Sequence, residues 1–177
     1  IMRALGPGSV SSFLKIILDV VYVALWIGVS VVGVLMLAAL LFSFNPEMLA
    51  DMAVTAGGEE IENRGPVVAL GLLAAAVYMG GILVIVAQLR KIFSTLTAGD
   101  PFHPDNVRRL RMVGLILAGL ELGRYAFWAL SSAILPDSNA VEPSLSLTAW
   151  FSVLVVFVLA EVFREGARLR REAELTI

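Results

Sequence analysis

Four long apolar runs are the feature that most restricts the fold of this chain. They cover about residues 13–44, 66–88, 112–135 and 147–163. An α-helix rises about 1.5 Å per residue, so the runs are long enough to cross a hydrocarbon core of about 30 Å, the fourth only just. Within lipid every backbone polar group needs a partner, and a single span satisfies its own groups as a helix. The runs therefore predict an all-α integral membrane protein with four transmembrane helices.

The composition agrees with a membrane location and excludes several kinds of site. The 177 residues are 59% hydrophobic and 16% charged, which is more apolar surface than a water-soluble fold of this size can cover. The chain has no cysteine and one histidine, His103, which argues against disulfides, thiol nucleophiles and the usual zinc sites. Because no nucleophile–base pair or metal constellation is apparent, we expect no enzymatic activity, no metal and no cofactor.

The basic residues predict the orientation. Eleven of the 13 lysines and arginines flank one set of span ends: Arg3, Lys15, Arg90, Lys91, Arg108, Arg109, Arg111, Arg164, Arg168, Arg170 and Arg171. Arg64 lies on the opposite side and Arg124 lies inside the third run. Since positive charge is retained in the cytoplasm, we expect both termini and the central loop there. Short connections favour a single-domain four-helix bundle over residues 1–177, up-down-up-down and antiparallel, with residues 164–177 as a helical cytoplasmic tail.

The loops carry mostly local structural signals. The central loop reads Gly-Asp-Pro-Phe-His-Pro-Asp-Asn over residues 99–106. Pro104 suits the first turn of a helix, and Asp105 or Asn106 can cap that helix or favour its start. We prefer this turn to a metal site made from Asp100, His103 and Asp105, because one imidazole without a fourth ligand is a poor match. In the outer loop, residues 46–54 predict a short interfacial helix before a turn at residues 57–58.

Two charges lie within the third run. Counted from an inner boundary near Met112, Glu121 has a depth of about 13 Å and Arg124 of about 18 Å. An intramembrane charge costs a few kcal/mol, so both should face the protein interior or water. Their i,i+3 spacing allows them to pair with each other. Asp19 and Glu161 lie nearer the inner boundary, where water is within reach.

Two interpretations of the buried charges stay open. One is an outward-opening pocket that combines the pair with aromatic residues of similar depth: Glu121, Arg124, Tyr125, Trp128, Trp26 and Tyr78. The other is an ion pair that only braces the bundle, which we favour because four short helices leave little room for a cavity. Gly119 and Gly123 form a GxxxG pattern on the nearly opposite face. This pattern predicts a close helix contact and offers a surface for a homo-oligomer.

Two stretches resemble a known family. They are residues 99–111, with Gly99-Asp100-Pro101-Phe102 and Asn106-Val107-Arg108-Arg109-Leu110-Arg111, and the ending from Phe163 to Ile177. Both are similar to the bacterial inner-membrane family called domain of unknown function 2975. The resemblance implies a four-helix protein of the bacterial inner membrane, frequently encoded beside a small Cro-like helix-turn-helix regulator. It supplies no established catalytic residues.

This pairing leads to a functional expectation. We expect a signalling protein that binds and restrains such a regulator through its central loop and tail. Apolar anchors ringed by charge suit a specific protein contact. The expected contact residues are Phe102, Arg108, Arg109, Arg111, Arg168, Leu169, Leu175 and Ile177. Direct nucleic-acid binding is not expected, because each basic cluster adjoins a span. The alternative is a small transporter, channel-like or immunity protein that uses Glu121 and Arg124.

Overall fold

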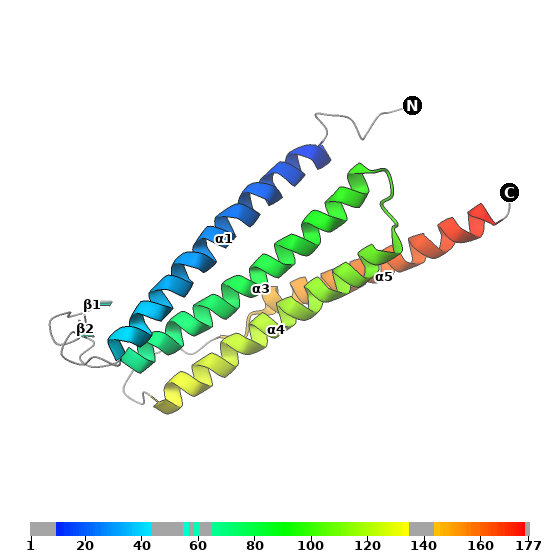
Figure 1. The fold of residues 1–177 in the computed structure, drawn as a ribbon. Coiled ribbons are helices and arrows are strands. Elements are labelled where there is room, and N and C mark those ends of the chain that lie inside the picture. Colours follow the sequence, from blue (N-terminus) through cyan, green and yellow to red (C-terminus); the bar gives the residue numbers. More distant parts are fainter. Residues whose placement is uncertain (1–9, 44–54, 57–58, 61–64, 135–143, 176–177) are drawn as a thin grey trace. The chain divides into compact units, whose positions relative to one another are not determined.

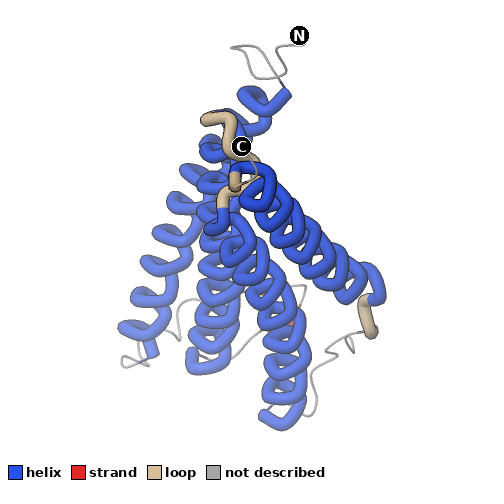
Figure 2. The backbone as a smooth tube through the Cα atoms, turned by 90° about the vertical axis from the view of Figure 1, so that its right-hand side faces the viewer, coloured by secondary structure: helices blue, strands red, loops and turns tan. Residues whose placement is uncertain are grey.

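The computed structural model describes residues 10–43, 55–56, 59–60, 65–134 and 144–175 of the chain. Four long helices make up nearly all of this part, as can be followed in Figures 1 and 2. They are α1 (Val10–Ser43), α3 (Gly65–Thr97), α4 (Pro104–Ile134) and α5 (Leu147–Glu174). All four are long and apolar enough to cross a membrane. The prediction of an all-α, multi-pass membrane protein is therefore confirmed.

A minimal hairpin lies between α1 and α3. Strand β1 (Thr55–Ala56) pairs antiparallel with β2 (Glu59–Glu60), so that Thr55 lies opposite Glu60. The turn expected at residues 57–58 lies outside the described residues. The interfacial helix expected over residues 46–54 lies outside the described residues.

The helices extend beyond the apolar runs. Helix α3 continues to Thr97 and α4 already begins at Pro104, whereas the apolar runs end near Gln88 and start near Met112. Hydroxyl groups support the last turns of α3, because Ser94 Oγ donates to the Lys91 carbonyl and Thr97 Oγ1 to the Phe93 carbonyl. Hydropathy marks only the part of a helix that lipid requires, so it places the end of α3 too early and the start of α4 too late. Helix α5 also runs without interruption into the expected helical tail.

Gly99 ends α3 with a Schellman turn. Its φ of 83° lies in the left-handed region, where residues with a side chain are strained. The Gly99 N–H donates to the Leu96 carbonyl at 3.1 Å, and the Asp100 N–H donates to the Thr95 carbonyl at 3.0 Å. These two bonds satisfy carbonyl groups that the helix end leaves open. The chain can then reverse within a few residues and begin α4.

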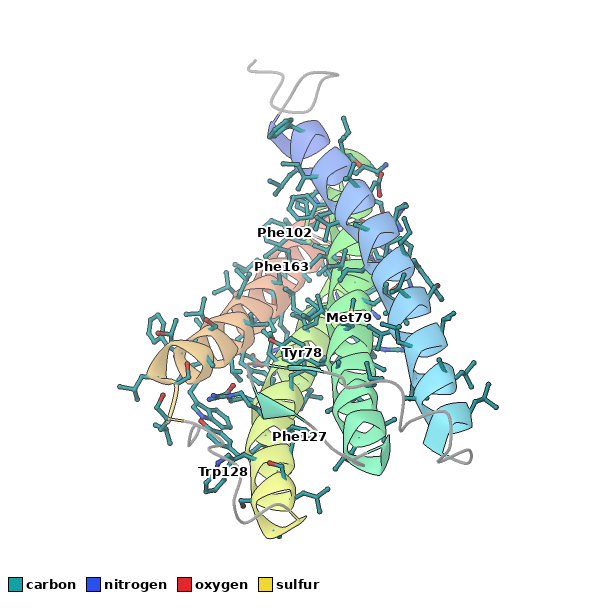
Figure 3. The ribbon with its side chains drawn as sticks, turned by 90° about the vertical axis from the view of Figure 1, so that its left-hand side faces the viewer. Tyr78, Met79, Phe102, Phe127, Trp128 and Phe163 are labelled. Atoms are coloured by element: carbon teal, nitrogen blue, oxygen red, sulfur yellow. The ribbon has the colours of Figure 1, made fainter. Side chains whose placement is uncertain are left out.

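The chain divides into two compact units, which are described separately. The second unit spans Ala24–Gly80 and contains adjoining parts of α1 and α3. There the side chain of Met79 (labelled in Figure 3) lies directly against Gly28, where a Cβ atom would collide with it. Many large apolar side chains of α1 are exposed, among them Val34 and Leu41. Exposed apolar surface of this extent is what a lipid-facing helix presents.

In the first unit, Ile1–Val23 with Gly81–Ile177, α4 packs between the end of α3 and α5. A Cβ at Gly81 would meet Leu120, and a Cβ at Gly114 would meet Phe157 at 3.0 Å. Toward the other end of α4, residues near Asn106 contact the end of α3, and residues near Phe102 contact the end of α5. In both pairs the residue numbers rise along one helix and fall along the other, so within this unit α4 runs antiparallel to the end of α3 and to α5. Ile92, Leu110 and Ala160 form the buried core between them.

Candidate functional site

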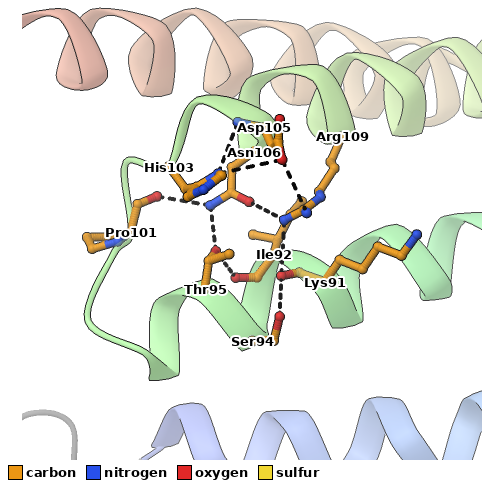
Figure 4. A network of polar contacts seen from close by, with 9 residues as sticks. All are labelled: Lys91, Ile92, Ser94, Thr95, Pro101, His103, Asp105, Asn106 and Arg109. Carbon is orange, nitrogen blue, oxygen red and sulfur yellow. Dashed lines mark hydrogen bonds and ion pairs between the residues drawn. The ribbon is translucent and has the colours of Figure 1, made fainter.

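Asn106 organises one end of the first unit, which we call the loop end: the end of α3, residues 98–103, the start of α4 and the end of α5. Its side chain is fully buried, with 0% exposure. Asn106 Nδ2 donates to Thr95 Oγ1 at 2.7 Å and to the Pro101 carbonyl at 3.2 Å, and Oδ1 accepts from Arg109 Nη1 at 2.9 Å (Figure 4). One amide thus fastens α3, the loop and α4 together.

His103 caps α4. Pro104 is the first helical residue, as predicted, and His103 Nδ1 accepts a hydrogen bond from the Asp105 N–H at 3.2 Å. Neither Asp105 nor Asn106 provides the cap, because Asn106 turns inward and Asp105 lies within the first turn; the other role predicted for these residues, to favour the helix start, is confirmed for Asp105. Asp105 still favours the helix start through its negative charge. Among the described residues, no group of three or more His, Asp or Glu side chains is placed to hold a metal ion.

The loop and the tail of α5 contact each other. The rings of Phe102 and Phe163 lie 5.7 Å apart at an angle of 57° (Figure 3). Phe102 also covers Gly166, where a Cβ would lie too close to the ring. Asp100 forms an ion pair with Arg170. A pocket of about 270 Å³ lies along this contact, with Phe102, Ala167 and Arg171 among its lining residues.

The residues expected to bind a partner differ in whether their side chains already have partners within the chain and in how exposed they are. Arg109 is held by Asn106, and Arg111 forms a 2.9 Å ion pair with Glu161. Arg168 pairs with Glu165 at 2.6 Å and with Glu172 at 3.5 Å. By contrast, Leu169 is 54% exposed and Leu175 86% exposed. Phe102 stays 37% exposed despite its ring contact. Arg108 makes no side-chain ion pair with a described residue, and Ile177 lies outside the described residues.

Glu121 and Arg124 form the predicted pair on α4. Arg124 Nη2 lies 2.7 Å from Glu121 Oε1, and Arg124 Nε lies 3.3 Å from Oε2. Tyr125 donates its hydroxyl proton to Glu121 Oε1 at 2.9 Å, and the Arg124 guanidinium lies over the Tyr125 ring at 4.9 Å. The Glu121 side chain is only 11% exposed. Both oxygens of the Glu121 carboxylate therefore accept hydrogen bonds from groups within the protein.

This cluster is tied to the entry of α5. Arg124 Nη2 donates to the Ser144 carbonyl at 3.1 Å, and the Ser146 N–H donates to the Tyr125 hydroxyl at 3.4 Å. Ser146 itself caps α5, since its Oγ accepts from the Ala149 N–H at 3.2 Å. Counted along α4 the pair lies far from the helix start, but it lies beside the first residues of α5. The depth expected for the pair was counted along α4, whereas along α5 the pair lies close to the helix start.

The other predicted pocket residues are placed differently. Trp128 lies one turn beyond Arg124, and its Nε1 is buried with no hydrogen-bond partner among the described residues. Trp26 and Tyr78 belong to the second unit, and each is half exposed. In the first unit the structure thus brings together Glu121, Arg124 and Tyr125.

The glycine face of α4 makes no close contact within the first unit. A Cβ at Gly119 or at Gly123 would have no described atom of this unit within 4 Å. The close helix contact that the GxxxG pattern predicted is therefore not made there. Close helix contacts at glycines of the first unit occur instead at Gly81 and Gly114.

Two pairs of charges that join different helices were not predicted. Asp19 of α1 accepts from Arg90 Nε of α3 at 2.5 Å, and the Arg90 guanidinium lies 4.3 Å from the centre of the Tyr22 ring. Glu161 of α5 pairs with Arg111 of α4. The sequence contains a usable signal, because in each pair an acid and a base lie close to the same expected inner boundary, at the ends of different runs. Depth alone does not say which runs are neighbours.

A comparison with protein families shows to which family the chain belongs. The model of the family described as protein of unknown function (DUF2975) matches residues 29–177. The chain belongs to this family. Neither a curated protein nor a solved structure matches the chain. The two stretches of the DUF2975 chain that carried the resemblance are the ones that meet at Phe102 and Gly166.

The two polar clusters of this DUF2975 protein have different chemical capacities. At the loop end, exposed apolar side chains stand next to charged ones, which suits reversible contact with another molecule. Around Glu121 the hydrogen bonds close on the chain itself, which suits a brace. The loop end is therefore the stronger candidate for a functional surface.

Proposed function

We propose that this DUF2975 protein is a membrane signalling protein that binds and restrains a small cytoplasmic helix-turn-helix regulator. The observation that supports this most directly is the contact between the loop and the tail of α5. Asp100 with Arg170, and Phe102 with Gly166, join two separate stretches into one continuous surface. A partner can recognise both stretches at once.

The docking surface that we propose consists of Phe102, Arg168, Leu169 and Leu175. Arg109 and Arg111 have partners within the chain and are 22% and 46% exposed, and Arg108 lies in a pocket on the side of α3. Arg168 also has partners, but its side chain is 62% exposed. Burying one exposed leucine side chain contributes about 1.5–3 kcal/mol. Two leucines and the edge of a phenylalanine ring, surrounded by arginines and glutamates, thus suit the centre of a specific interface, where a few buried side chains supply most of the binding free energy.

The proposal includes a topology. We propose an up-down-up-down arrangement in a bacterial inner membrane with both termini and the loop end in the cytoplasm. It is supported by the basic residues gathered at the loop end and by the antiparallel contacts of α4 with α3 and α5. We propose no enzymatic activity, no cofactor and no direct contact with nucleic acid. The open Gly119/Gly123 face remains the proposed surface for a homo-oligomer.

A binding titration tests the docking surface. The full-length protein in nanodiscs is titrated with the purified helix-turn-helix regulator that we expect to be encoded beside its gene. Leu169→Ser with Leu175→Ser should weaken binding at least tenfold, because two apolar anchors are lost. Ala173→Ser is the matched control, since it introduces the same side chain at an exposed position of the same tail. If wild-type protein does not bind the regulator, or if both variants bind like wild type, the proposal is wrong.

One observation favours the alternative of a small transporter, channel-like or immunity protein. Trp128 Nε1, near the intramembrane charges, is a buried donor without a described partner, and such a group is available to a ligand. The bonds from Arg124 and Tyr125 to residues 144–146 favour the brace instead. Failure of the binding titration would move our preference to this alternative.

A further inference from the structure

A second pocket of the loop end lies between α3 and α4, on another side than the contact with α5. Its volume is about 200 Å³, and it is lined by Gln88, Lys91, Asp105, Arg108, Arg109 and Met112. Gln88 Nε2 donates to Met112 Sδ at 3.3 Å, which joins the two helices at the pocket. A volume of 200 Å³ equals that of about seven waters in the liquid. The pocket can therefore hold a small polar group.

The charge in this pocket is unbalanced. Three cations, Lys91, Arg108 and Arg109, face one carboxylate, Asp105, which lies 3.8 Å from Arg109 Nη2. The side chains of Lys91 and Arg108 form no ion pair or hydrogen bond with the described residues. Most other described basic side chains are paired, the exceptions being Lys15 and Arg171. Two of the four unpaired cations thus line one pocket.

Arg109 gives the pocket a fixed wall. Its Nη1 donates to Asn106 Oδ1 at 2.9 Å and to the Lys91 carbonyl at 3.3 Å (Figure 4). Its side chain is 22% exposed, less than those of the surface arginines of the tail. A guanidinium held in this way presents its remaining N–H groups without further loss of side-chain entropy. Planar guanidinium groups match the oxygens of a phosphate.

The pocket lies where the apolar part of the protein ends. Gln88 and Met112 are the residues at which the apolar runs of α3 and α4 stop, and Lys91 and Arg108 lie one turn further on. In a bilayer this is the level of the lipid headgroups. Basic pockets between transmembrane helices at this level bind the phosphates of anionic lipids.

We propose that the Lys91–Arg108–Arg109 pocket binds a phosphate group, presented by the headgroup of an anionic phospholipid. Lys91 and Arg108 supply mobile charges that close on the phosphate, and Arg109 supplies the preformed side. The site goes beyond the proposed signalling function, because it uses the side of α3 and none of the docking surface.

Lipid binding to the purified full-length protein tests the proposal. Native mass spectrometry in detergent compares the affinity for phosphatidylglycerol with that for phosphatidylcholine of the same acyl chains. Wild type should prefer phosphatidylglycerol, and Lys91→Gln with Arg108→Gln should lower that affinity about thirtyfold. Lys15→Gln with Arg171→Gln removes the same charge from the other two unpaired positions and should lower it less than about threefold. Equal losses in the two double variants, or equal affinity for the two lipids, would overturn the proposal.

Two further measurements complete the test. Lys91→Arg with Arg108→Lys preserves the charges and should retain lipid binding, which separates loss of the site from loss of the fold. Inorganic phosphate at millimolar concentration, added without lipid, distinguishes the sources. Thermal stabilisation by phosphate with no preference for phosphatidylglycerol assigns the pocket to soluble phosphate and overturns the lipid source. Preference for the lipid without an effect of free phosphate supports the headgroup.

Discussion

Asn106→Ala removes the only fully buried polar side chain of the described core and leaves its three partners behind. The bonds to Thr95 and Pro101 are neutral, and the bond from Arg109 is charge-assisted. A neutral bond contributes about 1 kcal/mol and a charged one about 1.5–3 kcal/mol. The Arg109 side chain is 22% exposed, so water can replace part of its lost bond. The expected cost is therefore about 3 kcal/mol, most of it from the groups left without a partner.

Thermal unfolding in detergent measures this cost. For a chain of this size, about 3 kcal/mol corresponds to a fall in the unfolding midpoint of roughly 6–12 °C. Ser94→Ala is the control, because Ser94 is exposed and bonds only to a carbonyl of its own helix. It should change the free energy of unfolding by less than about 0.5 kcal/mol. If Asn106→Ala shifts the midpoint no more than Ser94→Ala does, Asn106 does not hold the loop end together.

Three further predictions concern the pair on α4, the turn after α3 and the topology. Arg124→Gln alone should destabilise more than Glu121→Gln with Arg124→Gln, with a coupling of about 1 kcal/mol or more in a double-mutant cycle; additive effects would show that the two residues act independently. Gly99→Ala should lower the free energy of unfolding by about 1 kcal/mol because of the positive φ, whereas Gly119→Ala, in an open helical position, should be neutral or stabilising; equal effects would contradict the strain. Cysteines introduced by Gly57→Cys and Ser138→Cys should react with an impermeant reagent on intact cells and one introduced by Ala98→Cys should not; labelling of the latter would reverse the orientation.

The helices could be predicted from the sequence because lipid imposes one requirement on every residue of a span. An apolar run of sufficient length has to be a helix whatever it packs against. The ends of α3 and α4 could not be predicted in this way. Beyond Gln88 and before Met112 the helices are held by hydroxyl bonds to carbonyls, the Gly99 turn and the His103 cap. These features are local, and the hydropathy pattern of the sequence does not reveal them.

The pair of Glu121 and Arg124 followed from spacing within one helix, which is why the prediction succeeded. The burial of Asn106 did not follow from its position. It depends on how a turn of a few residues orients the Asn106 side chain toward Thr95, and the hydrophobic periodicity contains no information about that orientation. The position of Phe102 over Gly166 likewise requires the register between α4 and α5. That register is set by packing between helices, which a single sequence does not specify.

The continuity of α5 has a mechanical consequence. The helix contains no proline, and its 28 residues form a rod about 42 Å long. One end is fixed to Tyr125 through Ser146, and the other carries Arg170, which is fixed to Asp100. Its single glycine, Gly166, is the most pliable point, and the ring of Phe102 lies directly on it. Because the Phe102 ring supports this point, we expect a displacement of the segment that enters α5 to reach the tail as an axial movement of similar size, with little bending at Gly166.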